Sequence, residues 1–186
     1  MTLTLCNGKG GVGKTSAAIL LGLALTEAGH QVYVCDTDPQ PTATRWIKEG
    51  DLPFVTAGKA TTSIIDTPPR LDSKAVAEAI KKSDVVIVVT SPSPADLFTS
   101  QDTARLIEKL GATQKARLLF NQVQEGTLLA RDLEGTAERV GLVALKSFLR
   151  RRQCYQQAVL LGWSVLPASA KEEVFKVALE ITAMVK

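Results

Sequence analysis

The stretch CNGKGGVGKTS at residues 6–16 combines four glycines with two lysines and a threonine. Gly8, Gly13, Lys14 and Thr15 fit the spacing G-x-x-x-x-G-K-[ST]. In this pattern the glycines let backbone N–H groups turn toward a phosphate, the lysine reaches the terminal phosphate oxygens, and the hydroxyl binds Mg²⁺. The stretch therefore predicts a loop that binds the phosphates of a nucleotide, in preference to a glycine-rich turn with no ligand.

Two acidic segments follow apolar runs and could serve the same chemistry. VYVCDTDPQ places Asp36 and Asp38 after one run, and TTSIID ends a second run at Asp66. Carboxylates near a triphosphate repel it unless Mg²⁺ lies between them, so we expect these groups to act through the metal and its waters. An apolar run ending in Asp is common by chance, and DTDP alone could be a turn. The combination with the loop makes the prediction specific.

The elements that must position these residues alternate along the chain. Apolar, β-branched runs predict strands at 2–6, 31–36, 61–66, 84–90, 116–121 and 141–145. Helical patterns occupy 15–29, 72–82, 95–110, 127–140, 153–161 and 170–185. Alternation of this kind predicts an α/β fold, a three-layer sandwich with a mostly parallel central sheet flanked by helices. The carboxyl ends of the strands should bring Asp36 and Asp66 to the glycine loop. We expect one domain over residues 1–186.

Composition sets the broad class. The 186 residues are 45% hydrophobic and 22% charged, with a net charge of +3. This balance is ordinary for a soluble protein; it permits a polyanionic partner without requiring one. Cys6, Cys35 and Cys154 are far apart and predict buried thiols in a reducing compartment. No signal peptide or membrane-spanning run is evident, so we expect a cytoplasmic protein.

The spacing K-G-G-x-G-K-T resembles the deviant Walker A motif of the ParA/MinD ATPases, a P-loop family with ATP and Mg²⁺ as cofactors. In that family two subunits face each other across ATP, and the front lysine, here Lys9, contacts the partner's nucleotide. The resemblance implies catalytic roles for Lys9, Lys14 and Asp38 and metal-binding roles for Thr15, Asp36 and Asp66. The implied nucleotide-binding residues are Gly8, Lys9, Gly10, Gly11, Val12, Gly13, Lys14, Thr15, Ser16 and Asn121.

The resemblance covers nearly the whole chain and is strongest to the small ParA proteins of plasmid partition. DTDPQPTATRWIKEG resembles their switch and following helix, VVTSPSPADL their proline-containing interface segment, and 150–167 their R-x-x-Y-x-x-A stretch. The chain departs in two places. It lacks an N-terminal helix-turn-helix, so operator binding is not expected, and the stretch between Asp38 and Asp66 is short.

Other segments suggest partners. Asn121 in NQV follows a strand where related folds contact the base, and Gln122 and Gln124 do not form a guanine-binding N-K-x-D. Arg150, Arg151 and Arg152 form the densest basic run, which the resemblance favours as a non-specific DNA contact over an unpartnered helix start. The last helix carries an apolar stripe, but three glutamates in it favour core packing over a membrane anchor.

The resemblance therefore implies a nucleoid-associated ATPase that dimerises with ATP, binds DNA without sequence preference and positions a cargo. A partner adaptor protein would stimulate hydrolysis. Plasmid DNA is the expected cargo. One alternative is the positioning of carboxysomes or another organelle, although Lys9 is missing from the best-known proteins of that kind. An alternative of another class is a metabolic ATP-dependent ligase or small-molecule kinase, which would need a committed substrate pocket.

Overall fold

The computed structural model describes residues 1–185 and contains an all-parallel sheet of five strands in the order β2-β3-β1-β4-β5. The strands are β1 (Thr2–Cys6), β2 (Val32–Asp36), β3 (Thr62–Asp66), β4 (Val85–Thr90) and β5 (Ala116–Phe120). Every residue of β4 is buried, as its unbroken apolar sequence predicts for the interior of a parallel sheet.

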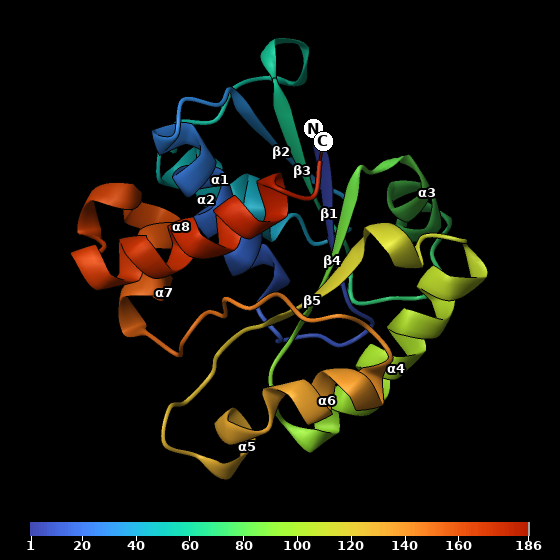
Figure 1. Cartoon of the computed structure of the whole chain (residues 1–186). Coiled ribbons are helices and arrows are strands. Elements are labelled where there is room, and N and C mark those ends of the chain that lie inside the picture. Colours follow the sequence, from blue (N-terminus) through green and yellow to red (C-terminus); the bar gives the residue numbers. More distant parts are fainter. Residues whose placement is uncertain (186) are drawn as a thin grey trace.

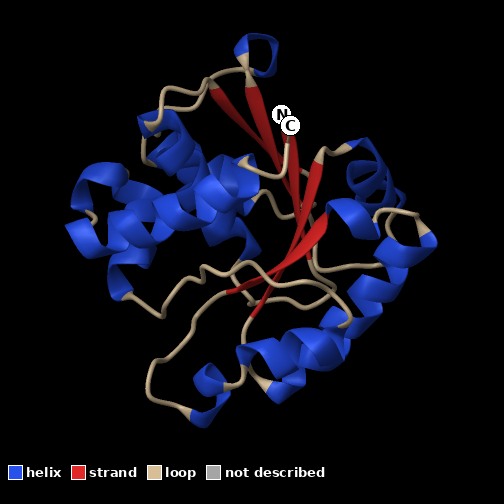
Figure 2. Cartoon of the chain, viewed as in Figure 1, coloured by secondary structure: helices blue, strands red, loops and turns tan. Residues whose placement is uncertain are grey.

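Helices cover both faces of the sheet, which confirms the predicted α/β sandwich (Figures 1 and 2). One face packs against α1 (Lys14–Glu27), α2 (Thr42–Glu49), α7 (Gln153–Leu161) and α8 (Ala168–Thr182). The other packs against α3 (Lys74–Lys82), α4 (Pro94–Lys109) and α6 (Leu133–Val140). α1 is buried along most of its length between the sheet and α8, so its N-terminus is held firmly at the carboxyl edge of the sheet.

The predicted helix at 127–140 is wrong as one element. It is divided into α5 (Leu128–Arg131) and α6 by Asp132, whose backbone leaves the helical region with φ −121° and ψ 47°. Aspartate competes with the helix through its short polar side chain, which makes it a frequent break point.

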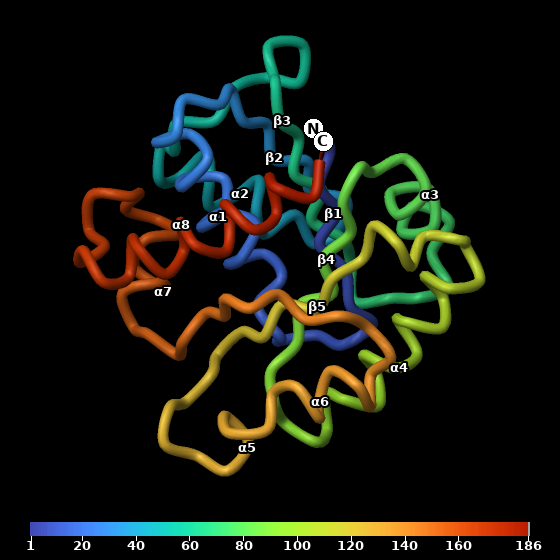
Figure 3. Tube along the Cα trace, in the orientation of Figure 1, coloured from blue at the N-terminus to red at the C-terminus, as the bar shows by residue number. Residues whose placement is uncertain are grey.

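The predicted sixth strand at 141–145 is also wrong, because the segment passes beside β5 (Figure 3) but forms a single isolated bridge with it, between Ala144 and Leu118. Leu145 N–H donates to the carbonyl of Leu118, but the next two N–H groups, of Lys146 and Ser147, donate to the Glu180 carboxylate at 2.8 and 2.7 Å. A carboxylate on α8 thus takes the Ser147 N–H, the donor that would have continued the ladder.

Candidate functional site

The glycine loop joins β1 to α1 at the carboxyl edge of the sheet. Gly13 immediately precedes α1 with φ +88°, a conformation that favours glycine, and an added Cβ would lie 2.2 Å from Asn121 Nδ2. At the other end, a Cβ on Gly8 would lie 2.8 Å from Leu71 Cγ. The glycines therefore allow close packing as well as an inward turn of the backbone.

Three amides fasten the loop to neighbouring elements. Asn7 Nδ2 donates to the Val89 carbonyl at 2.8 Å, and Asn7 Oδ1 accepts from Lys9 N–H at 2.9 Å. Asn121 and Gln122 donate to the carbonyls of Val12 and Gly11, at 2.8 and 3.1 Å. Asn7 and Gln122 were not predicted as site residues. A polar residue directly after a strand gives no sign of which carbonyl it will contact.

Lys14 lies inside its own loop. Its Nζ donates to the Lys9 carbonyl at 2.9 Å, and the residue is only 7% exposed. Burial lowers the pKa of Lys14, and the negative charge of Asp66 partly offsets that effect. A buried ammonium beside a turn of backbone N–H groups is well suited to bind the oxygens of a phosphate.

Lys9 points elsewhere. Its side chain is 43% exposed, and Nζ lies 3.9 Å from Asp96 Oδ1, near the start of α4. The Asp96 carboxylate also accepts a hydrogen bond from Ser91 Oγ at 2.7 Å. The two lysines of one short loop therefore differ in position. Lys14 lines the cavity over the loop, and Lys9 lies at the surface.

The surroundings of Asp66 are those of a carboxylate that can bind a cation. Its Oδ2 accepts from Thr15 Oγ1 at 2.7 Å, whereas its Oδ1 is buried and has no hydrogen-bond partner within residues 1–185. Burial, with a smaller contribution from the nearby Asp36, raises the pKa of Asp66 to about 6 although the hydrogen bond from Thr15 lowers it. A hydroxyl beside a carboxylate with an orphaned oxygen fits Mg²⁺, which uses few protein ligands and completes its shell with phosphate and water.

Asp36 lies beside Asp66, as predicted, because the two residues are paired in register across β2 and β3. Its carboxylate accepts from the N–H groups of Asp38 at 3.0 Å and Thr44 at 3.1 Å, so it shapes the turn into α2. Asp38 Oδ1 accepts from Gln40 N–H at 2.9 Å. Asp38 also lines the cavity over the loop.

That cavity has a volume of about 310 Å³ and brings together seven of the predicted site residues. Its lining consists of Gly10, Gly11, Gly13, Lys14, Thr15, Ser16, Asp38, Thr42, Trp46, Thr67, Pro69 and Gln122. A smaller hollow of about 120 Å³ shares Gly13, Ser16 and Gln122 with it and extends to Asn121 and residues 150–156. The cavity over the phosphate loop and the smaller hollow are therefore neighbours that meet at Gly13, Ser16 and Gln122.

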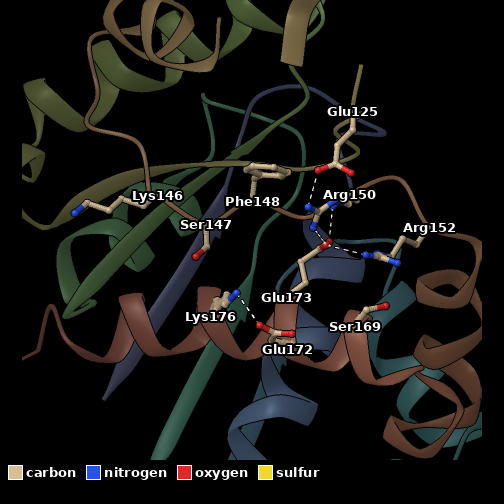
Figure 4. A pocket seen from close by; sticks show the side chains of 10 residues that line it. All are labelled: Glu125, Lys146, Ser147, Phe148, Arg150, Arg152, Ser169, Glu172, Glu173 and Lys176. Carbon is tan, nitrogen blue, oxygen red and sulfur yellow. Dashed lines mark hydrogen bonds and ion pairs between the residues drawn. The ribbon is translucent and has the colours of Figure 1, made fainter. Parts of the chain in front are cut away.

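The three predicted DNA-binding arginines differ in their surroundings, and Figure 4 shows those of Arg150 and Arg152. Arg150 donates to Glu125 at 2.6 Å and to Glu173, and Arg152 donates to Glu173 at 3.2 Å. Arg151 is exposed, and no ion pair of it is found among residues 1–185. The run therefore carries much less available positive charge than its sequence suggests.

Over the described range 1–185, no cluster of three or more His, Cys, Asp or Glu side chains is arranged to hold a metal. In the same part of the chain, no helix is long and apolar enough to cross a membrane. A metal at this edge would accordingly depend on phosphate oxygens as well as on Thr15 and Asp66.

A parallel sheet with a G-x-x-x-x-G-K-T loop at its carboxyl edge, a buried lysine and a carboxylate suited to Mg²⁺ defines a P-loop nucleotide-binding protein. The model of the CobQ/CobB/MinD/ParA nucleotide binding domain matches residues 3–163, and the chain belongs to that family. The resemblance noted in the sequence is thereby confirmed.

Two curated relatives align over most of the chain, and both are named maintenance of carboxysome distribution protein A. The Halothiobacillus neapolitanus protein is 31% identical over 91% of this chain and 88% of its own length. The Gloeobacter kilaueensis protein is 33% identical over 86% of this chain and 81% of its own length. A protein named ParA from Rhizobium radiobacter is 29% identical over 56% of this chain and 55% of its own.

Solved structures share the fold at low sequence identity. The MinD cell division protein of Aquifex aeolicus superposes with a TM-score of 0.76 at 14% identity, covering 98% of this chain and 97% of that one. The apo McdA structure from Cyanthece superposes with a TM-score of 0.74 at 18% identity, covering 97% of this chain and 98% of that one. These likenesses confirm the predicted P-loop sandwich.

Proposed function

We propose that this protein is an ATPase that dimerises when it binds ATP and uses hydrolysis to position a cellular cargo. The observation that carries the proposal is that the two loop lysines lie in different environments, one buried and one exposed. Lys14 is buried in its own loop, whereas the Lys9 side chain is exposed beside α4 and available to a second subunit.

In hydrolysis, Thr15 and Asp66 would hold Mg²⁺, and Lys14 would neutralise negative charge that develops on the phosphate oxygens. When bound, Mg²⁺ supplies positive charge against the same oxygens. Asp38, which lines the cavity, positions the attacking water and accepts its proton. Asp36 would help to hold the metal, and it keeps Asp38 in place by accepting a hydrogen bond from the Asp38 N–H.

The proposed partners are a second copy of the chain, DNA bound without sequence preference, and an adaptor protein that stimulates hydrolysis. For DNA, the surroundings of the arginines favour Arg151 as the contact residue within 150–152, because Arg150 and Arg152 are held by carboxylates. Contacts of this kind should weaken steeply with salt, since each neutralised phosphate releases counterions.

A protein-bounded body such as a carboxysome is the first candidate cargo. The two relatives named for carboxysome distribution align over 91% and 86% of the chain, whereas the Rhizobium radiobacter ParA aligns over 56%. Plasmid DNA is the second candidate, on the strength of Lys9 and the plasmid-partition resemblance of the interface segment VVTSPSPADL.

Phosphate release is the experiment that tests the activity. It should require Mg²⁺ and rise with DNA and adaptor, and no small metabolite should replace them. Turnover driven by a metabolite alone would favour the metabolic ligase or kinase instead. Capture of partners from the native extract by the Asp38→Ala variant with ATP would separate the cargoes. A centromere-binding protein among the captured partners would indicate plasmid, and an adaptor associated with a shell would indicate an organelle.

A further inference from the structure

A buried carboxylate on α8 lies outside the phosphate site and binds one short segment of the chain. Glu173 is 5% exposed, and each donor to it comes from residues 150–155. Its Oε1 accepts from Arg150 N–H at 2.6 Å and from Tyr155 Oη at 2.7 Å. Its Oε2 accepts from the guanidinium groups of Arg150 and Arg152 (Figure 4).

Burial raises the pKa of Glu173, but the hydrogen bonds from Arg150, Tyr155 and Arg152 outweigh it, so the pKa lies below its ordinary value. The carboxylate is therefore ionised and fully partnered at neutral pH. Burial and the bond to Glu173 also raise the pKa of Tyr155, which keeps that hydroxyl a donor. Such a cluster fixes the path of the segment that supplies its donors.

The same segment forms one wall of the hollow beside the phosphate loop. Arg150, Arg151, Arg152, Tyr155 and Gln156 line it from one side, and Gly13, Ser16, Leu20, Asn121 and Gln122 line it from the other. Because the hollow shares loop residues with the phosphate cavity, it lies where a nucleotide continues beyond its phosphates. Asp38 lines the phosphate cavity and not the hollow, which leaves the hollow free of carboxylates and open to a nucleoside end.

We propose that Glu173 is a positioning residue for the nucleoside end of the bound nucleotide: it holds residues 150–156 as the wall against which that end packs. The inference rests on the proposed function, since it assumes a nucleoside triphosphate at the loop. Glu173 touches neither phosphate nor metal; it acts through Arg150, Arg152 and Tyr155. The matched family model ends at residue 163, before α8 begins.

Removal of the carboxylate charge should loosen this wall selectively. Glu173→Gln leaves one amide oxygen as acceptor, so the Arg150 N–H, the two guanidinium groups and Tyr155 Oη can no longer all be satisfied. Within residues 1–185, Arg152 Nε already lacks a hydrogen-bond partner, and the alternative acceptor for Tyr155 Oη is the Ala170 carbonyl at 3.4 Å. Arg150 would keep Glu125 on its exposed side. The phosphate loop is fastened separately, by Asn7, Asn121 and Gln122, and should keep its shape.

The test compares two ligands and two adjacent glutamates. ATP has a nucleoside end and inorganic tripolyphosphate has none, so affinities for both are measured by calorimetry with Mg²⁺. Glu173→Gln should weaken ATP about tenfold, an amount equivalent to about 1.4 kcal/mol, and leave tripolyphosphate within about twofold. Glu172→Gln is the matched control, because Glu172 is exposed and pairs only with Lys176 on its own helix. It should change neither affinity.

A second variant covers the case in which Glu173→Gln does not fold. Tyr155→Phe removes one hydroxyl bond to Glu173 and keeps the ring, and it should weaken ATP by a few fold without affecting tripolyphosphate. Unchanged ATP affinity in both variants, or an equal loss for both ligands, would overturn the positioning role and leave the proposed function intact. Failure of the unmodified protein to bind ATP would overturn the proposed function, and this role with it.

Discussion

The loop at 8–15 and the run at 150–152 are the two most suggestive basic segments of the chain, and the fold treats them in opposite ways. At the loop, Lys14 is buried with only a carbonyl as hydrogen-bond acceptor, so its charge remains available to an anion. At 150–152, a carboxylate from α8 and another from residue 125 already neutralise two arginines. Positive charge in a sequence therefore indicates an anionic ligand only where no distant carboxylate has been folded against it.

The largest effect should come from the loop. Lys14→Ala should weaken ATP binding by about 100-fold or more, because loss of a buried charged partner costs several kcal/mol. Lys9→Ala is the matched control within the same loop and should still bind ATP. Calorimetric titration with Mg²⁺ and ATP measures both. Equal loss in the two variants would remove the distinction between the buried and the exposed lysine.

Asp38→Ala should bind ATP and Mg²⁺ normally but lose turnover by about 100-fold or more, because the water loses the group that orients it and accepts its proton. Phosphate release under saturating ATP measures the loss. Glu27→Ala is a suitable control, since Glu27 is exposed and lines neither the cavity nor the hollow. Normal turnover in Asp38→Ala would assign the water to another residue.

Much of the phosphate site at the carboxyl edge of the sheet could be predicted from the sequence, because it depends on local spacing and strand order. The residues from Gly8 to Thr15 are contiguous, and parallel pairing necessarily brings Asp36 and Asp66 to one edge. Glu173 could not be predicted, since its partners lie 18 to 23 residues away. Its one signal was its position four residues before Val177, on the apolar stripe of the last helix, where a charge needs a buried partner.

Single substitutions at 150–152 should show, through the free energy of unfolding, which arginines are neutralised by the fold. Arg150→Ala should lower the free energy of unfolding by about 1–3 kcal/mol, because Glu173 loses a buried charged donor but keeps Arg152 and Tyr155. Arg151→Ala should change it by less than about 0.5 kcal/mol, as expected of an exposed residue. Urea unfolding measures both values. A larger cost for Arg151 would mean that it, too, is engaged in the fold.

The effects of these two substitutions on DNA binding should be reversed, with the larger loss at Arg151. Arg151→Ala should weaken retention of DNA by the ATP-bound protein, whereas Arg150→Ala should leave most of it. Gel shifts at two salt concentrations, with nucleotide affinity measured in parallel, separate a DNA effect from a nucleotide effect. Undiminished retention by Arg151→Ala would take this residue out of the DNA contact.

The smallest effect should be a pH dependence of the cluster at Glu173. Because its folded-state pKa is lowered from the ordinary 4.5, the ionised group stabilises the fold above that value, and the contribution is lost as pH falls through the lowered pKa. The stability difference between the unmodified protein and Glu173→Gln should therefore be constant near neutral pH and shrink below about 4.5. Urea midpoints from pH 7 to pH 3 measure it. A difference that grows on acidification would contradict the direction of the shift.

The central claim, that Lys9 serves a second subunit's nucleotide, is tested most directly by the molar mass in solution. Light scattering of the 19.9 kDa chain should give a monomer with ADP and about twice that mass with ATP, using Asp38→Ala to preserve the ATP. Adding Lys9→Ala to that variant should abolish the doubling while ATP still binds. The same mass with ADP and ATP would contradict the account, and so would a dimer that forms equally well without Lys9.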